Sequence, residues 1–369
     1  MMWLIIFAVS IGCGVAAAYY LAGKVEKTGI FSSVKSTALT KVLAVAVVIA
    51  IVVIFCLIFD VTNTIVIVVH VAVFMLVGDL VRIAALSAAR RPLKPWIFDA
   101  ASFTLCVIYL LIGWILMHGL WETTYTLSTA KDTGNIRIAQ IADSHVGTGF
   151  SGKGFGEKLA KIQETHPDIL VITGDFVDDG TMRQDMVDAC AALEGFEAKY
   201  GVYFCFGNHD RGYYSNERRG YDGDDLVAEL EKNGIKVLED ESLLVDDRFY
   251  VIGRADAGHG GSTRMSMQEL VAGLDKDKYM IVLDHQPTDY DAEAAAGVDL
   301  VLSGHTHGGQ IFPLEYIQPL VSENDNVRGH EKRGNTDFIV TDGISDWAIK
   351  FKTGCKSEFN IIDISGEGV

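Results

Sequence analysis

The chain has 369 residues with 31 Lys/Arg and 48 Asp/Glu, which gives a net charge of −17. Residues 1–129 carry only 8 basic and 5 acidic side chains, whereas residues 130–369 carry 23 and 43. This division excludes a single soluble globule, a disordered chain and a basic protein that binds nucleic acid by neutralising phosphates.

Four apolar stretches in the first part are long enough to cross a bilayer, which takes about 20 residues. We predict four membrane spans at Met1–Gly23, Val42–Phe59, Val61 to about Ala89, and Ala100–Met117. The first residues lack the basic segment of a cleaved signal peptide, so the first span is expected to be retained. The sequence therefore predicts a region of four transmembrane helices over 1–117, followed by a linker over 118–135.

The placement of lysine and arginine predicts how these spans are oriented. Basic residues occur in the first and third connections, at Lys24, Lys27, Lys35, Lys41, Arg90, Arg91 and Lys94. The second connection, Asp60–Thr64, has none. Because positively charged loops stay in the cytoplasm, we expect a multi-pass protein of the cell membrane with everything after the fourth span outside the cytoplasm.

The third span contains three ionisable residues, His70, Asp79 and Arg82. Such residues permit a transport or proton-relay interpretation. A structural interpretation is favoured, because Asp79 and Arg82 are three residues apart and can pair on one helical face. Arg82 can also extend toward the nearby membrane surface.

From Ile136 onward, short β-rich runs alternate with helical periods, a pattern typical of a layered α/β domain. We assign residues 136–369 to this domain. Strands are predicted at Ile136–Ala142, Asp168–Thr173, Val202–Phe206, Phe249–Gly253, Tyr279–Asp284, Val298–Ser303 and Phe338–Thr341. Helices are predicted at about Gly154–His166, Met182–Leu193, Asp224–Asn233 and Ser266–Leu274.

Residues of the kinds that bind metals follow five of the predicted strands, where an α/β sheet presents its loops to ligand. The five blocks are Ala142-Asp143-Ser144-His145, Gly174-Asp175-Phe176-Val177-Asp178-Asp179, Gly207-Asn208-His209-Asp210, Asp284-His285-Gln286-Pro287 and Gly304-His305-Thr306-His307-Gly308-Gly309-Gln310. Any one block can occur by chance. Five in this order at strand ends indicate a functional site.

Chemistry that uses two metals requires such a set of residues. Two divalent cations about 3.5–4 Å apart can clamp a phosphoryl group and share a hydroxide nucleophile. A bridging carboxylate is needed to offset their repulsion, and imidazole and carboxylate ligands suit manganese, iron or zinc. Glycines before Asp175, Asn208 and His305 allow sharp turns that aim these side chains into one pocket.

The five blocks resemble the D-x-H, G-D-x-x-D, G-N-H-D/E, H and G-H-x-H motifs of the calcineurin-like metallophosphoesterase superfamily. The resemblance covers about residues 135–365 and implies a four-layer α/β/β/α sandwich with two divalent metal ions. It implies that Asp175 bridges the two ions. One ion would be held by Asp143, His145 and His307, and the other by Asn208, His285 and His305.

The same resemblance implies catalytic roles for two further residues. His209 would lie beside the phosphoryl group, as the acid for the leaving oxygen or as a charge stabiliser, and Asp178 would orient it. Phosphoprotein phosphatases follow their matching aspartate with a phosphate-binding arginine, and here Asp179 occupies that place. The extended last block, with Phe312-Pro313 after it, resembles a bacterial membrane-associated branch that includes UDP-2,3-diacylglucosamine pyrophosphatase-like enzymes.

Residues outside the blocks are also expected to contact substrate. Arg211, with Arg218 and Arg219, follows the Gly-Asn-His-Asp block closely enough to line the entrance of the site. His259 lies in a glycine-rich loop that could reach substrate. A solvated loop is the alternative for both.

The sequence thus predicts a membrane-anchored dinuclear-metal phosphoesterase in which metal-activated water attacks phosphorus. Attachment to the bilayer benefits substrates that reside there, and a domain with a net charge of −20 would otherwise be repelled from an anionic surface. We therefore expect a phosphoester or pyrophosphate of a lipid or lipid-linked substrate. The alternatives are a sensory or scaffold membrane protein with weak activity, a surface hydrolase of soluble phosphodiesters, and a transporter with an accessory hydrolase.

Overall fold

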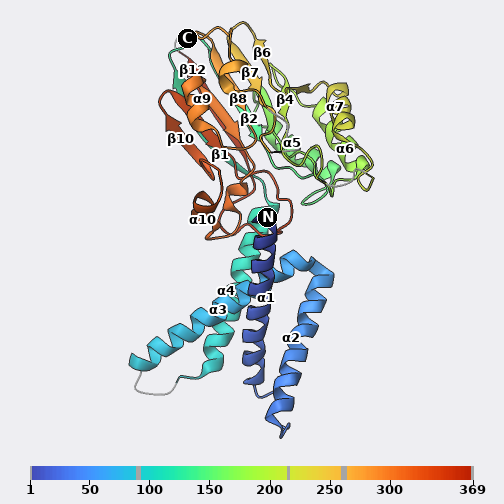
Figure 1. Cartoon of the computed structure of the whole chain (residues 1–369), viewed down its shortest axis with the longest axis vertical. Coiled ribbons are helices and arrows are strands. Elements are labelled where there is room, and N and C mark those ends of the chain that lie inside the picture. The colour runs from blue at the N-terminus through green and yellow to red at the C-terminus, as the bar shows by residue number, and fades with distance from the viewer. Residues whose placement is uncertain (1, 89–92, 214–216, 259–263, 367–369) are drawn as a thin grey trace. The chain divides into compact units, whose positions relative to one another are not determined.

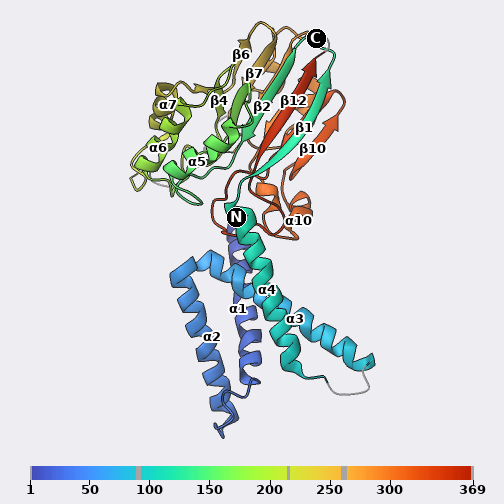
Figure 2. The same cartoon turned by 180° about the vertical axis from the view of Figure 1, so that it is seen from behind.

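The structure is a computed structural model that describes residues 2–88, 93–213, 217–258 and 264–366 (Figure 1). The chain forms two compact units, Met1–Gly113 and Trp114–Val369. Figure 2 shows the same chain from behind.

Long apolar helices build the N-terminal unit. They are α1 (Met2–Glu26), α2 (Thr37–Phe59), α3 (Val61–Ala88) and α4 (Pro95–His118), the last of which ends inside the C-terminal unit. All four are long and apolar enough to cross a membrane. Large apolar side chains cover their outer surfaces, and Leu57 of α2 is 83% exposed. The prediction of four apolar helices is confirmed, with ends that differ by a few residues.

Polar side chains in the N-terminal unit connect different helices. The Lys24 ammonium donates to Asp79 of α3 at 2.7 Å and to Asp99 of α4 at 2.6 Å. The Tyr20 hydroxyl also donates to Asp79, at 2.8 Å. The expected pair of Asp79 with Arg82 is therefore wrong, because a lysine near the end of α1 reaches the carboxylate from a neighbouring helix.

The C-terminal unit contains two six-stranded sheets, ordered β1-β12-β2-β3-β4-β5 and β10-β11-β9-β8-β7-β6. The strands of the first sheet are β1 (Trp121–Thr129), β2 (Asn135–Ile141), β3 (Ile169–Thr173), β4 (Val202–Cys205), β5 (Lys236–Val237) and β12 (Glu358–Gly366). Those of the second are β6 (Glu241–Val245), β7 (Phe249–Gly253), β8 (Tyr279–Leu283), β9 (Leu300–Ser303), β10 (Gly329–Arg333) and β11 (Thr336–Val340). A core that includes Ile138, Val171, Val251 and Ile281 joins the two sheets.

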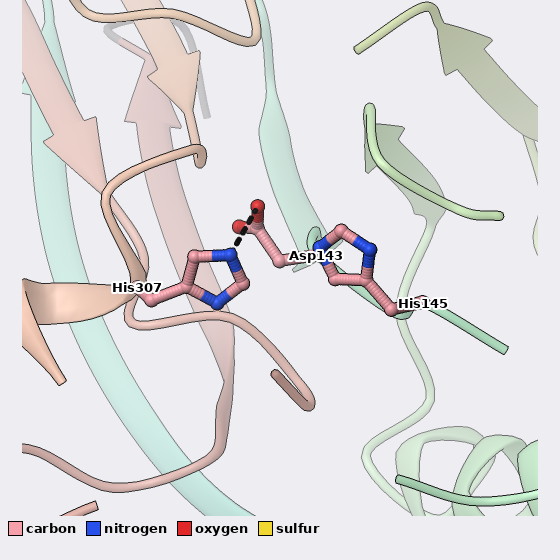
Figure 3. Close-up of side chains that lie close together, drawn as sticks. All are labelled: Asp143, His145 and His307. Atoms are coloured by element: carbon pink, nitrogen blue, oxygen red, sulfur yellow. Dashed lines mark ion pairs between the residues drawn. The ribbon is translucent and has the colours of Figure 1, made fainter. Parts of the chain in front are cut away.

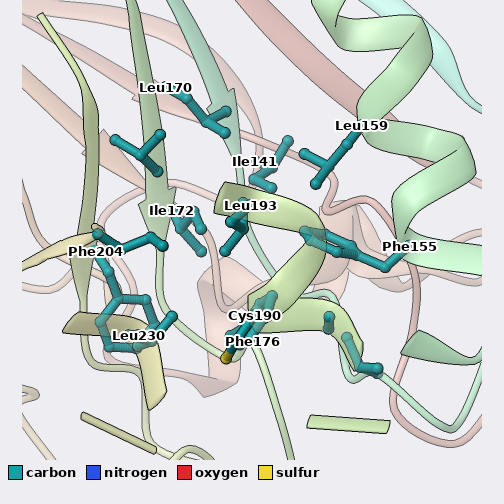
Figure 4. Close-up of a cluster of buried hydrophobic side chains, with 14 of the residues drawn as sticks. Ile141, Phe155, Leu159, Leu170, Ile172, Phe176, Cys190, Leu193, Phe204 and Leu230 are labelled. Atoms are coloured by element: carbon teal, nitrogen blue, oxygen red, sulfur yellow. The ribbon is translucent and has the colours of Figure 1, made fainter. Parts of the chain in front are cut away.

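Helices cover the outer face of each sheet. They are α5 (Gly152–Gln163), α6 (Arg183–Glu194) and α7 (Gly223–Lys232) on the first sheet, and α8 (Met267–Leu270) and α9 (Tyr290–Ala296) on the second. Figure 4 shows the core beneath the first set, where Phe155 and Leu159 of α5 meet Ile141 and Leu170 of the sheet. These residues of α5 are four apart and so lie on one helical face. The four-layer α/β/β/α arrangement is thus confirmed.

The segment 118–135, expected to be a linker, contains the nine-residue strand β1. This strand pairs in parallel with β12 from Trp121 opposite Glu358 to Thr129 opposite Gly366. It buries Leu127 in the core between the sheets. Only one side of an edge strand meets the core, so its apolar content is low and its sequence resembles a linker.

Short elements account for the other differences from the expected arrangement. The helix predicted at Ser266–Leu274 is limited to the four residues of α8. A turn follows, and Gly273 adopts a φ of +85° that favours glycine. The structure adds elements too short for a periodic signal, among them β5, β6, β10, α9 and α10 (Leu314–Val321).

Candidate metal centre

The five sequence blocks meet where two sets of parallel strands end. Strands β2, β3 and β4 are parallel neighbours in the first sheet, and β8 and β9 are parallel neighbours in the second. Loops after these strands carry Asp143, His145, Asp175, Asn208, His285, His305 and His307. Parallel strands end at a common edge, so residues far apart in the sequence are brought to one place.

Three buried side chains form a first group, Asp143, His145 and His307 (Figure 3). One ligand-type atom of each lies within 4.8 Å of the others. The His307 Nε2 is 3.6 Å from the Asp143 Oδ1, and the His145 and His307 rings stack at 5.3 Å. Neither ring nitrogen of His145 makes a well-formed hydrogen bond among the described residues, although carboxylates of Asp178 and Asp175 lie 3.3 Å and 3.7 Å away. Buried imidazole nitrogens without good hydrogen bonds are costly, and they fit a group that binds a metal ion.

A second group consists of Asp175, His285 and His305, again with ligand-type atoms within 4.8 Å. The His285 Nδ1 lies 2.8 Å from the Thr173 carbonyl oxygen, which can only accept, so this nitrogen carries a proton. The other nitrogen, Nε2, faces the Asp175 carboxylate at 3.2 Å. A backbone contact of this kind fixes which histidine nitrogen is available to a metal.

The side-chain oxygen of Asn208 completes the second group. It lies 2.8 Å from the His305 Nδ1 and 3.2 Å from the His285 Nε2. Its amide nitrogen donates to the Tyr213 hydroxyl at 2.6 Å, which turns the oxygen toward the histidines. An oxygen ligand is thereby presented beside two imidazoles.

Asp175 contacts both groups. Its Oδ2 lies 3.7 Å from the His145 Nε2 and 3.2 Å from the His285 Nε2. Its Oδ1 accepts the backbone N–H of His209 at 2.8 Å. Burial by itself would raise the pKa of Asp175, but the imidazoles of His285 and His145 hold that pKa well below its usual range. One charged carboxylate therefore lies between the two groups.

Strained backbone conformations are concentrated in these loops. Positive φ angles occur at Asp143 (+53°), His145 (+40°), Asp175 (+51°), His305 (+71°) and His307 (+50°). Residues other than glycine avoid this region, at a cost of order 1–3 kcal/mol each. Such strain persists where the surrounding structure enforces it, and it occurs here at five of the seven residues expected to bind metal.

The glycines of the blocks serve two different purposes. Gly174 has a φ of +79°, as expected of a sharp turn before Asp175. Gly207 and Gly304 are instead required by close approach. A Cβ at Gly207 would lie 2.3 Å from the Asp175 backbone nitrogen, and one at Gly304 would lie 2.6 Å from the Asp143 Oδ2.

Asp210 is a residue of the site that sequence reasoning missed. Its buried carboxylate accepts the backbone N–H groups of Asp175 at 2.9 Å, Val177 at 3.0 Å and Gly207 at 2.7 Å. The Arg219 guanidinium donates to the Asp210 carbonyl at 3.1 Å and is buried, so it does not line the entrance as expected. Asp210 joins the loops after β3 and β4, and its place in the Gly-Asn-His-Asp block was the available signal.

Asp178 contacts a different histidine from the one expected. Its Oδ2 lies 3.3 Å from the His145 Nδ1, and its Oδ1 accepts the Gly180 and Thr181 N–H groups. The structure gives no hydrogen bond or ion pair between Asp178 and His209 among the described residues. Burial would lower the pKa of His145, but the carboxylates of Asp178, Asp175 and Asp143 together raise it to about 9.

His209 lies at the opening of the site between aromatic rings. Its ring meets that of Tyr213 edge-on at 4.8 Å and stacks on that of Trp347 at 6.1 Å. Both aromatic side chains are substantially exposed. Asp179, which replaces the arginine of the phosphoprotein phosphatases, accepts the Tyr213 N–H at 3.0 Å and so holds this loop.

Arg211, expected to contact substrate, pairs with carboxylates in the structure. Its guanidinium pairs with Glu239 at 2.7 Å and Asp224 at 3.7 Å, and it covers the Phe206 ring. These carboxylates are distant in sequence, which is why the pairing was not predictable. His259 lies outside the described residues.

Comparisons with known proteins agree with this site. A family model described as calcineurin-like phosphoesterase matches residues 136–309. An uncharacterized metallophosphoesterase of Aquifex aeolicus is 32% identical over 253 residues, which cover 66% of this chain and 91% of that protein. One from Campylobacter jejuni is 29% identical and covers 63% of this chain and 60% of that protein. A transmembrane protein with metallophosphoesterase domain from Danio rerio is 28% identical over 63% of this chain and 54% of that protein. The matches thus span less than two thirds of the last two proteins.

Replacing Asp210 should loosen the metal-ligand loops. In Asp210→Asn one acceptor oxygen becomes an NH₂ group that faces backbone N–H donors, at a cost of about 1–3 kcal/mol. We expect urea unfolding of the fragment 114–369 to show this loss of stability. Asp224→Asn is the matched control, since that side chain is 94% exposed. Equal stability of the two variants would contradict the role given to Asp210.

Proposed function

Because this chain belongs to the calcineurin-like phosphoesterase family, we propose that it is a membrane-anchored phosphoesterase with two divalent metal ions. Its proposed substrate is a phosphoester or pyrophosphate of a lipid or lipid-linked molecule. The observation that carries the proposal is the position of the Asp175 carboxylate, within 3.7 Å of a histidine of each ligand group.

The residues present fit two metal ions. We assign one ion to Asp143, His145 and His307, and the other to Asn208, His285 and His305, with Asp175 shared between them. This set of imidazole, carboxylate and amide donors suits manganese, iron or zinc. When bound, such a pair polarises a phosphoryl group and makes water acidic enough to attack it near neutral pH.

His209 is the proposed proton donor to the leaving oxygen, or the stabiliser of its charge. Its backbone N–H is held by the Asp175 carboxylate, and its ring is partly exposed at the opening of the site. The main chain of His209 is therefore fixed to the site, although His209 is not one of the proposed metal ligands. Asp178 orients His145, so it positions a proposed metal ligand and not the proposed proton donor His209.

The first sheet supports a substrate at the membrane surface. Where α4 ends, the Met117 carbonyl accepts the Ser357 hydroxyl at 2.6 Å, and the Leu116 carbonyl accepts the Ser357 N–H at 2.9 Å. Ser357 immediately precedes β12, which is antiparallel to β2. The start of β12 and the Asp143 loop after β2 thus lie at the same edge of the sheet. The last apolar helix ends at the edge that carries the metal-ligand loops.

The exposed rings of Tyr213 and Trp347 support the same substrate class, because they offer apolar contact beside the phosphoryl site. We place the C-terminal unit outside the cytoplasm, since the basic connections between the spans favour the cytoplasmic side.

The shared role of Asp175 can be tested through metal content. Asp175→Asn should empty or weaken both sites, because one bridging charge offsets two cations, whereas His307→Ala should affect mainly one. Elemental analysis of the purified protein measures the metal-to-protein ratio. His330→Ala is the control, since His330 pairs with Asp337 outside the site. Two full equivalents in Asp175→Asn would contradict the bridge.

The role of His209 can be tested with leaving groups of different basicity. His209→Ala should keep both metals and lose turnover by about 10²–10⁴-fold on alkyl esters, the usual contribution of a general acid. A nitrophenyl ester needs little protonation and should lose less. Steady-state kinetics on both ester types decides the matter, and an equal loss would argue against proton donation.

The lipid substrate can be tested by comparing two forms of the protein. Full-length protein in lipid vesicles should prefer a lipid-embedded phosphoester over a water-soluble one, because the anchor raises its effective concentration at the bilayer. The fragment 114–369, which retains β1, should lose much of that preference. If both forms show the same relative efficiency, the lipid substrate is excluded while the metal chemistry stands.

A further inference from the structure

Helix α10 exposes an apolar face, whereas a surface helix of a soluble domain usually exposes a polar one. Its eight residues bury no side chain fully. Glu315 is its inward-facing charge, 3.3 Å from Arg328. The outer surface is apolar, with exposed fractions of 82% at Leu320 and 63% at Val321. The exposed apolar side chains of this segment are Phe312, Leu314, Tyr316, Ile317, Leu320 and Val321. An exposed apolar patch of this kind marks an interaction surface.

This patch is joined directly to the metal-ligand loop. The short helix η1 (His307–Gly309) contains the ligand His307, and α10 begins five residues after Gly309. The packing is close, since a Cβ at Gly309 would lie 2.5 Å from the Glu315 backbone nitrogen. A surface that engages α10 therefore also lies beside the proposed active site.

The patch is also close to the end of the fourth apolar helix. Thr353 accepts the Phe312 N–H at 3.2 Å, and its own N–H donates to Gln310 at 2.9 Å. Four residues later, Ser357 bonds the last turn of α4 at Leu116 and Met117. Four residues span at most about 14 Å when extended. The beginning of α10 is thus held near the place where the proposed membrane span ends.

Two lysines lie at the same end of a strongly acidic domain. A cavity of about 250 Å³ beside the last turn of α4 is lined by Lys158 and Lys161, with Glu157 as its acidic residue. The Lys158 ammonium contacts the Gly119 carbonyl at 3.4 Å and has no carboxylate partner among the described residues. Cations at this position complement anionic lipid headgroups.

We propose that α10, with Phe312, lies in the interface of the lipid bilayer and inserts its apolar face at the boundary of headgroups and acyl chains. Its polar residues face the domain, which is the orientation expected of an interfacial amphipathic helix. The metal centre is thereby held at headgroup level. The proposal rests on the membrane location proposed above, and it does not depend on the phosphoesterase activity.

Site-directed spin labelling of the full-length protein tests this position. Cys13 and Cys56 are replaced by serine, because the other four cysteines are buried. A nitroxide is then placed at Leu320→Cys, and the protein is inserted into vesicles of phosphatidylcholine and phosphatidylglycerol. We expect collisions with oxygen to exceed those with a water-soluble nickel complex at this site.

Two labelled controls set the scale. Leu244→Cys is the aqueous control, because Leu244 is an exposed leucine of β6, and Figures 1 and 2 show β6 and α10 at opposite ends of the C-terminal unit. Restored Cys56 of α2 is the bilayer control. If Leu320→Cys behaves like Leu244→Cys while Cys56 reports lipid, the inference is overturned and the membrane span stands.

A second result would also overturn it. Dipolar broadening at Leu320→Cys that disappears when unlabelled protein is added would show that the patch binds another copy of the chain. Hydrolysis of a nitrophenyl phosphoester by the same samples reports on the proposed activity separately, so a failure of either idea is recognised independently.

Discussion

The carboxylate of Asp175 is the contact on which the proposed centre depends. Burying a charge is costly unless it is paired and hydrogen-bonded. Here the pairing comes from His145 in a loop of the first sheet and His285 in a loop of the second. A single buried charge therefore draws together the ends of both sheets, which explains why neither sheet alone could build the site.

The layered fold provides the rigidity that this arrangement demands. Five loop residues hold left-handed backbone conformations, and Gly207 and Gly304 allow loops to approach more closely than any side chain would permit. Strained loops keep their shape only if their ends cannot move. The fully buried strands β3, β8 and β9 supply these fixed ends, and Asp210 links two of the loops through their backbone N–H groups.

The convergence of the ligand-type residues was predictable because parallel strands end at one edge of a sheet. A residue that directly follows such a strand must therefore lie at that edge. What depends on the path of a loop was not predictable. Asp178 faces His145 because its own loop folds back, so that the Gly180 N–H donates to the Asp178 carboxylate. Arg211 forms an ion pair with Glu239, a residue of another segment. Strand β1 was not predicted from the sequence because an edge strand buries few side chains. Its register is set by β12, at the far end of the chain.

The order of β1, β12 and β2 determines at which edge of the first sheet β1 begins. Strands β2, β3 and β4 run in one direction, and the loops that follow them lie at the edge where these strands end. A strand that begins at that same edge must run the opposite way. Strand β1 does so, and it is accommodated because β12, its parallel neighbour, also begins at that edge and is antiparallel to β2. The insertion of β12 between β1 and β2 thus brings the end of α4 and the candidate ligand loop after β2 to one edge of the sheet.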